Sequence, residues 1–216
     1  MNILVIAATE TELAGIRQAS SEMPDRPIST MVTGVGLLPS AYSIMQGIVL
    51  SKPDIILQIG IAGSFSKQLP LGTAVAVERE IFADMGVREY GAYRDIFDLG
   101  LAGKNTSPFV DGAVLNQHAG LLSAAGLPAV KAVSVNEISS SAERIALFAD
   151  VYKADIESME GAALHYVCTL QQIPFIQIRG ISNLVGERDK SNWKIKESLD
   201  AATAACINFI KKIDQP

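Results

Sequence analysis

Three polar side chains follow apolar segments of strand length and have the chemistry to act on one substrate. They are Glu12, Glu160 and Asn183. Because ligands of open α/β sheets bind beyond the carboxyl ends of the strands, these side chains are expected to converge at one sheet edge. The chain has only two histidines, so any acid–base chemistry is expected to use carboxylates.

Two glycine-rich segments also follow predicted strands. They are Gly34-Val35-Gly36 and Gly60-Ile61-Ala62-Gly63-Ser64. Neither fits a Walker phosphate loop or the complete dinucleotide fingerprint, which disfavours a phosphate cradle. Turns with positive φ explain these glycines without any ligand.

Each polar candidate has a purely structural interpretation as well. Thr9 and Glu12 have the spacing of a capping box. Glu160 is predicted in the first turn of a helix, where an acidic side chain interacts favourably with the helix dipole. Asn183 is also a common helix-cap or turn residue. The spacing alone leaves both interpretations open for each position.

Three further polar residues lie within apolar patterns. Arg179 interrupts an apolar strand and, if buried, must be paired, so we expect a carboxylate partner. His165, on an Ala-rich helical segment, is expected to be a core residue. His118 is expected at the surface.

The composition excludes several classes of protein. Of 216 residues, 49% are apolar and 19% are charged, which predicts a packed interior and not a disordered chain. The formal net charge is −5. An acidic chain lacks the basic footprint of a nucleic-acid binder and the Lys/Arg clusters that hold proteins on anionic membranes.

The cysteines and histidines argue against a disulfide framework or a metal site. Cys168 and Cys206 are the only cysteines, and both lie in Ala-rich helical patterns. No Cys/His cluster has metal-ligand spacing. The apolar start of the chain is short and lacks a basic flank, so it is interpreted as a strand and not a signal peptide. A reducing, cytoplasmic compartment is therefore expected, with no metal and no cofactor.

Apolar segments of strand length alternate with helical patterns. The predicted strands are Ile3–Ala8, Ile28–Thr33, Ile55–Ile59, Ala74–Ile81, Ala129–Val135, Ala154–Glu157 and Phe175–Ser182. The predicted helices are Glu10–Ala19, Pro39–Ser51, Leu115–Ala125, Ala142–Tyr152, Glu160–Gln172 and Asn192–Ile213. Most strands are continuously apolar, which predicts a three-layer α/β/α sandwich with a central twisted mixed sheet. We expect a single domain over residues 1–216, with one long irregular segment, Met85–Pro108.

The motifs together resemble the nucleoside phosphorylase and nucleosidase superfamily, in its methylthioadenosine/S-adenosylhomocysteine nucleosidase branch. The matching segments run in the family's order and cover nearly the whole chain. They are Ile3–Ala8 with Glu12, Thr33–Gly36, Pro53-Asp54 leading to Gly60–Gly63, Met159–Ala163 and Ile178–Asn183. The resemblance implies a nucleoside phosphorylase-like fold and cleavage of a purine nucleoside.

One departure changes the expected substrate. The adenine-specific nucleosidases carry Asp where this chain has Asn183. The Ser182-Asn183 pair, with the downstream segment Gly186–Asp189 and Trp193, instead resembles the futalosine hydrolase branch. That branch releases hypoxanthine from futalosine, leaving dehypoxanthine futalosine, in menaquinone biosynthesis. A methylthioadenosine/S-adenosylhomocysteine nucleosidase and a non-catalytic purine-binding module remain as alternatives.

The resemblance also implies roles for individual residues. Glu12 would be the general base for water, Glu160 would bind the ribose hydroxyls, and Met159 would pack against the sugar. Ala62 and Gly63 would let the backbone approach the base.

The leaving base poses a separate chemical problem. An Asn183 amide can donate to O6 of a 6-oxopurine and accept from a protonated N7, but it cannot supply the proton. That proton would have to come from water or a neighbour.

Hydrolysis is favoured over phosphorolysis, because Glu10 and Glu12 would repel phosphate at the turn after the first strand. Futalosine also carries an aryl carboxylate, and a buried anion needs a cation or several donors. We expect a homodimer or higher homo-oligomer, with Arg88 or Arg94 of the irregular segment near that carboxylate, either within one chain or across the interface. Arg188 and Lys190 are the alternatives.

Overall fold

The computed structural model describes residues 1–23 and 27–213. The strands are β1 (Ile3–Ala7), β2 (Ile28–Val32), β3 (Ile55–Ser64), β4 (Ala74–Phe82), β5 (Gly86–Glu89), β6 (Ala92–Asp95), β7 (Val114–Leu115), β8 (Ala129–Ser134), β9 (Ile156–Ser158) and β10 (Phe175–Leu184). The helices are α1 (Glu10–Ser21), α2 (Leu37–Ser51), α3 (Ala119–Ala125), α4 (Ala142–Ala146), α5 (Gly161–Gln171) and α6 (Ile195–Ile213).

The central sheet is mixed and partly closed. Its strand order is β10-β4-β8-β9-β3-β1-β2, and β10 also pairs with β3, so five of these strands form a ring. Strand β1 pairs parallel with β2 and β3, and β3 pairs parallel with β10. By contrast, β10 pairs antiparallel with β4, and β3 pairs antiparallel with β9. The ring brings the ends of β3, β9 and β10 together.

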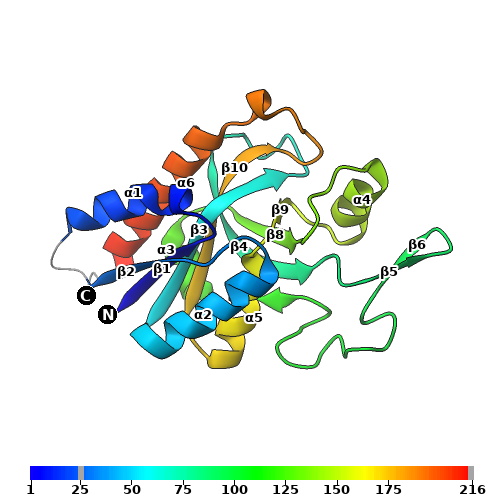
Figure 1. Cartoon of the computed structure of the whole chain (residues 1–216), viewed down its shortest axis with the longest axis horizontal. Coiled ribbons are helices and arrows are strands. Elements are labelled where there is room, and N and C mark those ends of the chain that lie inside the picture. The colour runs from blue at the N-terminus through cyan, green and yellow to red at the C-terminus, as the bar shows by residue number, and fades with distance from the viewer. Residues whose placement is uncertain (24–26, 214–216) are drawn as a thin grey trace.

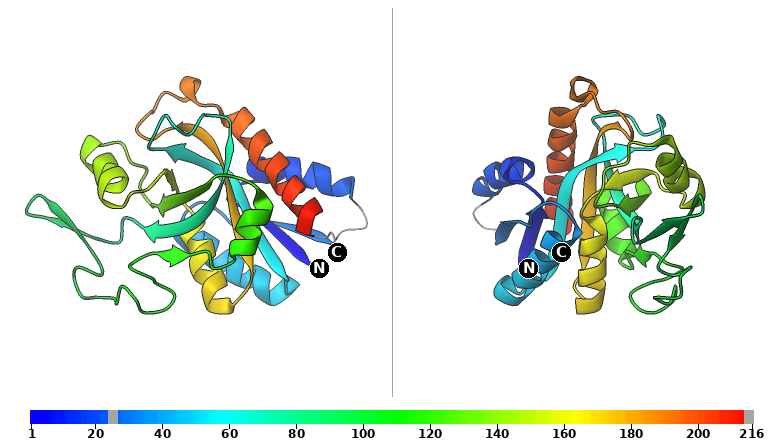
Figure 2. Two further views of the ribbon diagram at one scale, coloured as in Figure 1. Left: turned by 180° about the vertical axis from the view of Figure 1, so that it is seen from behind. Right: turned by 45° about the vertical axis from the view of Figure 1, so that its right-hand side comes forward.

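Helices cover both faces of this sheet, as Figures 1 and 2 show. On one face, Leu13 and Ile16 of α1 and Phe209 of α6 pack against alternate residues of β1 and β3. On the other face, α2 and α5 pack against the intervening residues. Burial on both faces explains why β1 is apolar at every position, and the predicted α/β sandwich with a central mixed sheet is confirmed.

Several predicted boundaries were wrong, and most errors involve polar or glycine residues that strand patterns do not favour. Strand β3 continues through the predicted turn Gly60–Ser64, and Asn183 lies inside β10. The predicted helix Leu115–Ala125 starts only at Ala119, because Val114 and Leu115 pair with β4. The segment expected to be irregular contains the hairpin β5–β6, which projects from the rest of the fold (Figure 1).

The histidines and cysteines occupy the interior to different extents. His165 is fully buried, and burial lowers the pKa of its imidazole to about 3, which keeps the ring neutral. His118, expected at the surface, is half-buried, and its ring meets Phe175 edge-on at 5.9 Å. Cys168 and Cys206 are free thiols in the core. Within the described ranges, no helix is both long and apolar enough to cross a membrane.

Gly180 tests the contact between β10 and α6. A Cβ added there would lie 2.1 Å from the backbone oxygen of Ser198, which no side-chain movement can relieve. We expect Gly180→Ala to lower the free energy of unfolding by about 1–3 kcal/mol or more, measured by urea denaturation. Gly120→Ala is the matched control, because its Cβ would meet nothing within 4 Å. Equal stability of the two variants would show that α6 does not press on this strand.

Candidate active site

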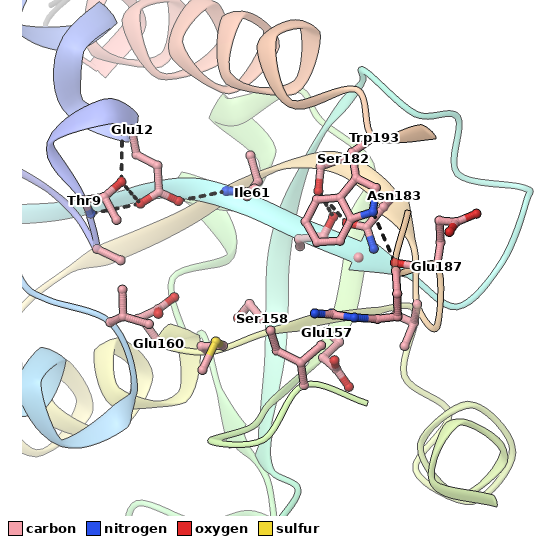
Figure 3. Close-up of a pocket in the computed structure, with 18 of the residues that line it drawn as sticks. Thr9, Glu12, Ile61, Glu157, Ser158, Glu160, Ser182, Asn183, Glu187 and Trp193 are labelled. Atoms are coloured by element: carbon pink, nitrogen blue, oxygen red, sulfur yellow. Dashed lines mark hydrogen bonds between the residues drawn. The ribbon is translucent and has the colours of Figure 1, made fainter. Parts of the chain in front are cut away.

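One pocket lies at the sheet edge where β1, β3, β9 and β10 end, and its lining is drawn in Figure 3. It brings together six of the residues singled out in the sequence: Glu12, Ala62, Gly63, Met159, Glu160 and Asn183. Residues to which the sequence analysis assigned no role in the site complete it, among them Glu157, Ser182 and Val185. The cavity volume is about 250 Å³, close to the lower end of the range for small-molecule sites.

Glu12 has both of the roles that its spacing allowed. Its Oε2 accepts from the backbone N–H and the hydroxyl of Thr9, and the Glu12 N–H donates to Thr9 Oγ1, which completes the capping box of α1. Its Oε1 accepts from the Ile61 N–H of β3 at 3.3 Å. The carboxylate is therefore held in a fixed orientation at the wall of the pocket.

Glu160 is paired with a buried arginine. It was predicted in the first turn of this helix but occupies the N-cap position, one residue before α5 begins, and its side chain makes no cap hydrogen bond. Oε1 accepts instead from the Gly36 N–H at 3.1 Å, and Oε2 lies 3.6 Å from Arg179 Nη2. Burial raises the pKa of the Glu160 carboxyl, while Arg179 opposes that shift.

Arg179 has the carboxylate partner expected from the sequence, and that partner is a pocket residue. The guanidinium is 1% exposed and also donates to Gln58 Oε1 at 3.1 Å. A Cβ at Gly60 would lie 2.4 Å from Arg179 Nη1 and 2.8 Å from Glu12 Oε1. Glycine at this strand position therefore leaves room for the guanidinium and the Glu12 carboxylate to share one space.

The glycines divide into two kinds. Gly34 and Gly36 have φ of 83° and 94°, so the predicted turns with positive φ are confirmed there. Gly60 and Gly63 lie in β3, where Gly60 pairs with β10 and Gly63 pairs with both β10 and β9, so the same interpretation is wrong for them. The absence of a side chain at both positions lets the side chains of other residues approach the strand closely.

Asn183 is placed by an irregularity in β10. The register with β3 shifts between Ile181 and Asn183, which makes Ser182 an extra residue in the strand. Ser182 Oγ donates to Asn183 Oδ1 at 2.7 Å, and Asn183 Nδ2 donates to the Leu184 carbonyl at 2.9 Å. Because a carbonyl accepts only, the Leu184 contact fixes which end of the amide carries the NH₂ group.

Beneath the pocket lies a buried carboxylate that sequence reasoning missed. Glu80 of β4 accepts from Gln177 Nε2 at 2.9 Å and from Ser134 Oγ at 3.0 Å, and burial raises its pKa to about 7. A Cβ at Gly161 would lie 1.9 Å from Glu80 Oε1, so the first residue of α5 rests on this network. The available signal was the charged run Glu78-Arg79-Glu80 within an otherwise apolar strand.

The predicted arginines lie away from the pocket of their own chain. Arg88 pairs with Glu143, and Arg94 pairs with Glu89 and donates to the Asp98 carbonyl. Of the two alternatives, Arg188 lines the pocket, on the loop after β10, and is exposed. In the residues that the structure describes, no cluster of three or more His, Cys, Asp or Glu side chains could hold a metal ion.

Comparisons with known proteins place this geometry in a family. The model of the phosphorylase superfamily matches residues 3–214. The futalosine hydrolase of Thermus thermophilus is 30% identical over 176 residues, covering 80% of this chain and 76% of the relative. A 5′-methylthioadenosine/S-adenosylhomocysteine nucleosidase of Haemophilus influenzae is 25% identical, covering 92% and 85%.

A solved structure shows the same fold. The structure of a futalosine hydrolase mutant of Helicobacter pylori superposes with a TM-score of 0.84 at 17% identity, covering 98% of this chain and 99% of the other. The resemblance inferred from the motifs is confirmed by these matches. The chain belongs to the phosphorylase superfamily, with futalosine hydrolases and methylthioadenosine/S-adenosylhomocysteine nucleosidases among its relatives.

Proposed function

We propose that this chain, as a single nucleosidase domain, hydrolyses the N-ribosidic bond of futalosine and releases hypoxanthine. The observation that carries the proposal is the fixed amide of Asn183 in a pocket that the Glu12 and Glu160 carboxylates also line. Similarity to the futalosine hydrolase of Thermus thermophilus supports the substrate. The reaction would produce dehypoxanthine futalosine in menaquinone biosynthesis, in the cytoplasm.

Glu12 acts as the general base. Its carboxylate is held by Thr9 and the Ile61 N–H, and this orientation lets it accept a proton from water as the water attacks C1′. The C1′–N9 bond breaks as the new C1′–O bond forms, and the bonding electrons leave with the base. No phosphate is needed, and the acidic wall formed by Glu12 and Glu160 disfavours an anionic nucleophile.

Glu160 serves the ribose. As the glycosidic bond breaks, the sugar gains oxocarbenium character, and an adjacent anion stabilises that positive charge. Arg179 and the Gly36 N–H hold the Glu160 carboxylate in place for the ribose hydroxyls. Met159 packs against the sugar, while Ala62 and Gly63 border the base.

Asn183 selects the base. One N–H of its amide is committed to the Leu184 carbonyl, and the second is available to O6 of hypoxanthine. Oδ1 keeps a lone pair for a protonated N7. The proton on N7 comes from water or a neighbouring acid, since the amide has none to give.

Base release distinguishes this proposal from its alternatives. Incubation with futalosine should give hypoxanthine, detected by chromatography, whereas methylthioadenosine and S-adenosylhomocysteine should give little adenine. Faster adenine release would favour the methylthioadenosine/S-adenosylhomocysteine nucleosidase activity named for several relatives. Release of neither base would leave a purine-binding module.

Two surface features support a homodimer. An exposed apolar stripe on α2 comprises Leu38, Tyr42 and Val49, which are 80%, 68% and 64% exposed. Contiguous apolar surface of this kind is typical of protein interfaces. A second copy would bury the stripe, and Arg88 and Arg94 on the projecting hairpin would then be available to the partner's substrate carboxylate.

Removing the base should abolish most turnover. Glu12→Gln keeps an acceptor for the Ile61 N–H but cannot take a proton, so we expect kcat to fall by at least about 100-fold. Glu10→Gln, on the exposed side of the same turn, is the control and should keep its activity. Activity of Glu12→Gln near that of the unmodified enzyme, with unchanged melting temperature, would return Glu12 to its capping role alone.

Replacing the amide should change the base preference. In Asn183→Asp a carboxylate oxygen faces both the Leu184 carbonyl and O6 of hypoxanthine, which are acceptors. A mismatched buried contact costs about 1–3 kcal/mol, so kcat/KM for futalosine should fall by about 10- to 100-fold. The kcat/KM for the 6-amino analogue of futalosine should rise relative to the kcat/KM for futalosine. Asn208→Asp on α6 is the control, and an unchanged ratio of the two substrates would locate base selection elsewhere.

The futalosine carboxylate provides a test of the arginines. Arg188→Ala, Arg88→Ala and Arg94→Ala are assayed with futalosine and with inosine, which lacks the carboxylate. Replacing a residue that binds the carboxylate should lower kcat/KM at least about tenfold for futalosine and only slightly for inosine. Loss from Arg88 or Arg94 would show a contribution from a partner chain, and loss from Arg188 alone would show binding within one chain. Equal losses on both substrates would indicate a structural role.

A further inference from the structure

Glu157 is a buried pocket carboxylate with one oxygen unused. It lies on β9, is 7% exposed and lines the pocket. Oε1 accepts from the Ser139 N–H at 3.0 Å, whereas Oε2 is fully buried and has no hydrogen-bond partner among the described residues. Leaving a charged acceptor buried and unsatisfied is costly, so such a group in a pocket marks a place for a ligand donor.

Strand pairing places Glu157 opposite Asn183. Gly63 of β3 is the Cα partner of Glu157 on one side and of Asn183 on the other. Residues paired in this way project to the same face of a sheet. Two strand spacings of about 4.8 Å separate their Cα atoms by about 10 Å, and Gly63 between them has no side chain. Figure 3 shows the two side chains on opposite sides of the end of β3.

We propose that Glu157 is a specificity-determining residue that accepts a hydrogen bond from N1–H of a 6-oxopurine lying over Gly63. This inference rests on the proposed function, because Asn183 is taken to bind O6 and N7 of the same base. In the purine, N1 and N7 lie on opposite sides of C6. In the sheet, Glu157 and Asn183 lie on opposite sides of Gly63, which matches this arrangement. Hypoxanthine carries a hydrogen on N1, whereas N1 of adenine is an acceptor and would face the carboxylate acceptor to acceptor.

The electrostatic surroundings fit an acceptor that gains a donor on binding. Desolvation raises the pKa of the Glu157 carboxyl, and the Ser139 hydrogen bond and Arg144 oppose that shift. Arg144 is itself paired with Asp84 and Glu137, so it is not available as a direct partner. An N1–H donor would satisfy the remaining oxygen without introducing another charge.

Glu157→Gln is the decisive variant because Ser139 fixes its orientation. The Ser139 N–H requires the amide oxygen at the position of Oε1, so the amide NH₂ replaces Oε2 and faces N1. The amide NH₂ would then face the N1–H of hypoxanthine, donor against donor, whereas it could donate to N1 of adenine. Glu137→Gln, in the neighbouring loop and 82% exposed, is the matched control.

The experiment measures kcat/KM on three substrates: futalosine, its 1-deaza analogue with C–H in place of N1–H, and its 6-amino analogue. For the unmodified enzyme and Glu137→Gln, loss of N1–H should lower kcat/KM by about 10- to 100-fold. In Glu157→Gln that penalty should disappear, and the ratio of 6-amino analogue to futalosine should rise at least about tenfold. If Glu157 had a purely structural role, Glu157→Gln would lower kcat/KM for all three substrates together.

Two results would overturn the assignment. Hypoxanthine release from futalosine with a 1-deaza penalty that is the same in Glu157→Gln as in the unmodified enzyme would remove Glu157 from base recognition and leave the proposed function standing. Absence of hypoxanthine release from the unmodified enzyme would overturn the proposed function and, with it, this assignment.

Discussion

The buried guanidinium of Arg179 is the interaction around which the pocket is organised. It lies in β10, 1% exposed, and contacts Gln58 of β3 and Glu160 at the start of α5. Removing one partner of a buried ion pair costs about 3–5 kcal/mol, so these elements are held in a fixed relation. Gly60 leaves the space in which the guanidinium and the Glu12 carboxylate come together. One cation thus orients Glu160 and ties together β3, β10 and the start of α5, which are far apart in the chain.

The pairing of β3 with β10 carries this arrangement to the base end of the pocket. The two strands pair from Phe175 to Leu184, with a register shift at Ser182 that sets the position of Asn183. Beyond Gly60, β3 also pairs with β9 and brings Glu157 into the same row. The sheet therefore places Glu12 and Glu160 at one end of the pocket and Asn183 and Glu157 at the other. The rigidity of paired strands suits a site that distinguishes donors from acceptors.

The pocket is acidic, and its carboxylates differ in their surroundings. Glu12 is supported by the backbone N–H groups of Thr9 and Ile61, Glu160 by a cation, and Glu157 by a single N–H. Burial raises the pKa of the second and third carboxyls to extents set by these partners. Separate environments of this kind can give carboxylates in one cavity different pKa values.

Local chemistry was enough to predict most elements and several candidates. Apolar runs predicted the buried strands, the Thr9-Glu12 spacing predicted the capping box, and an arginine in an apolar strand predicted its carboxylate partner. These features depend on residues close in sequence or on the cost of burying a charge. The tertiary structure alone decided that β3 continues through Gly60–Ser64, that the sheet closes through β10, and that Glu157 and Asn183 flank Gly63 in one row of the sheet. Such outcomes depend on pairing between distant strands, because a register is fixed by partners that no local pattern contains.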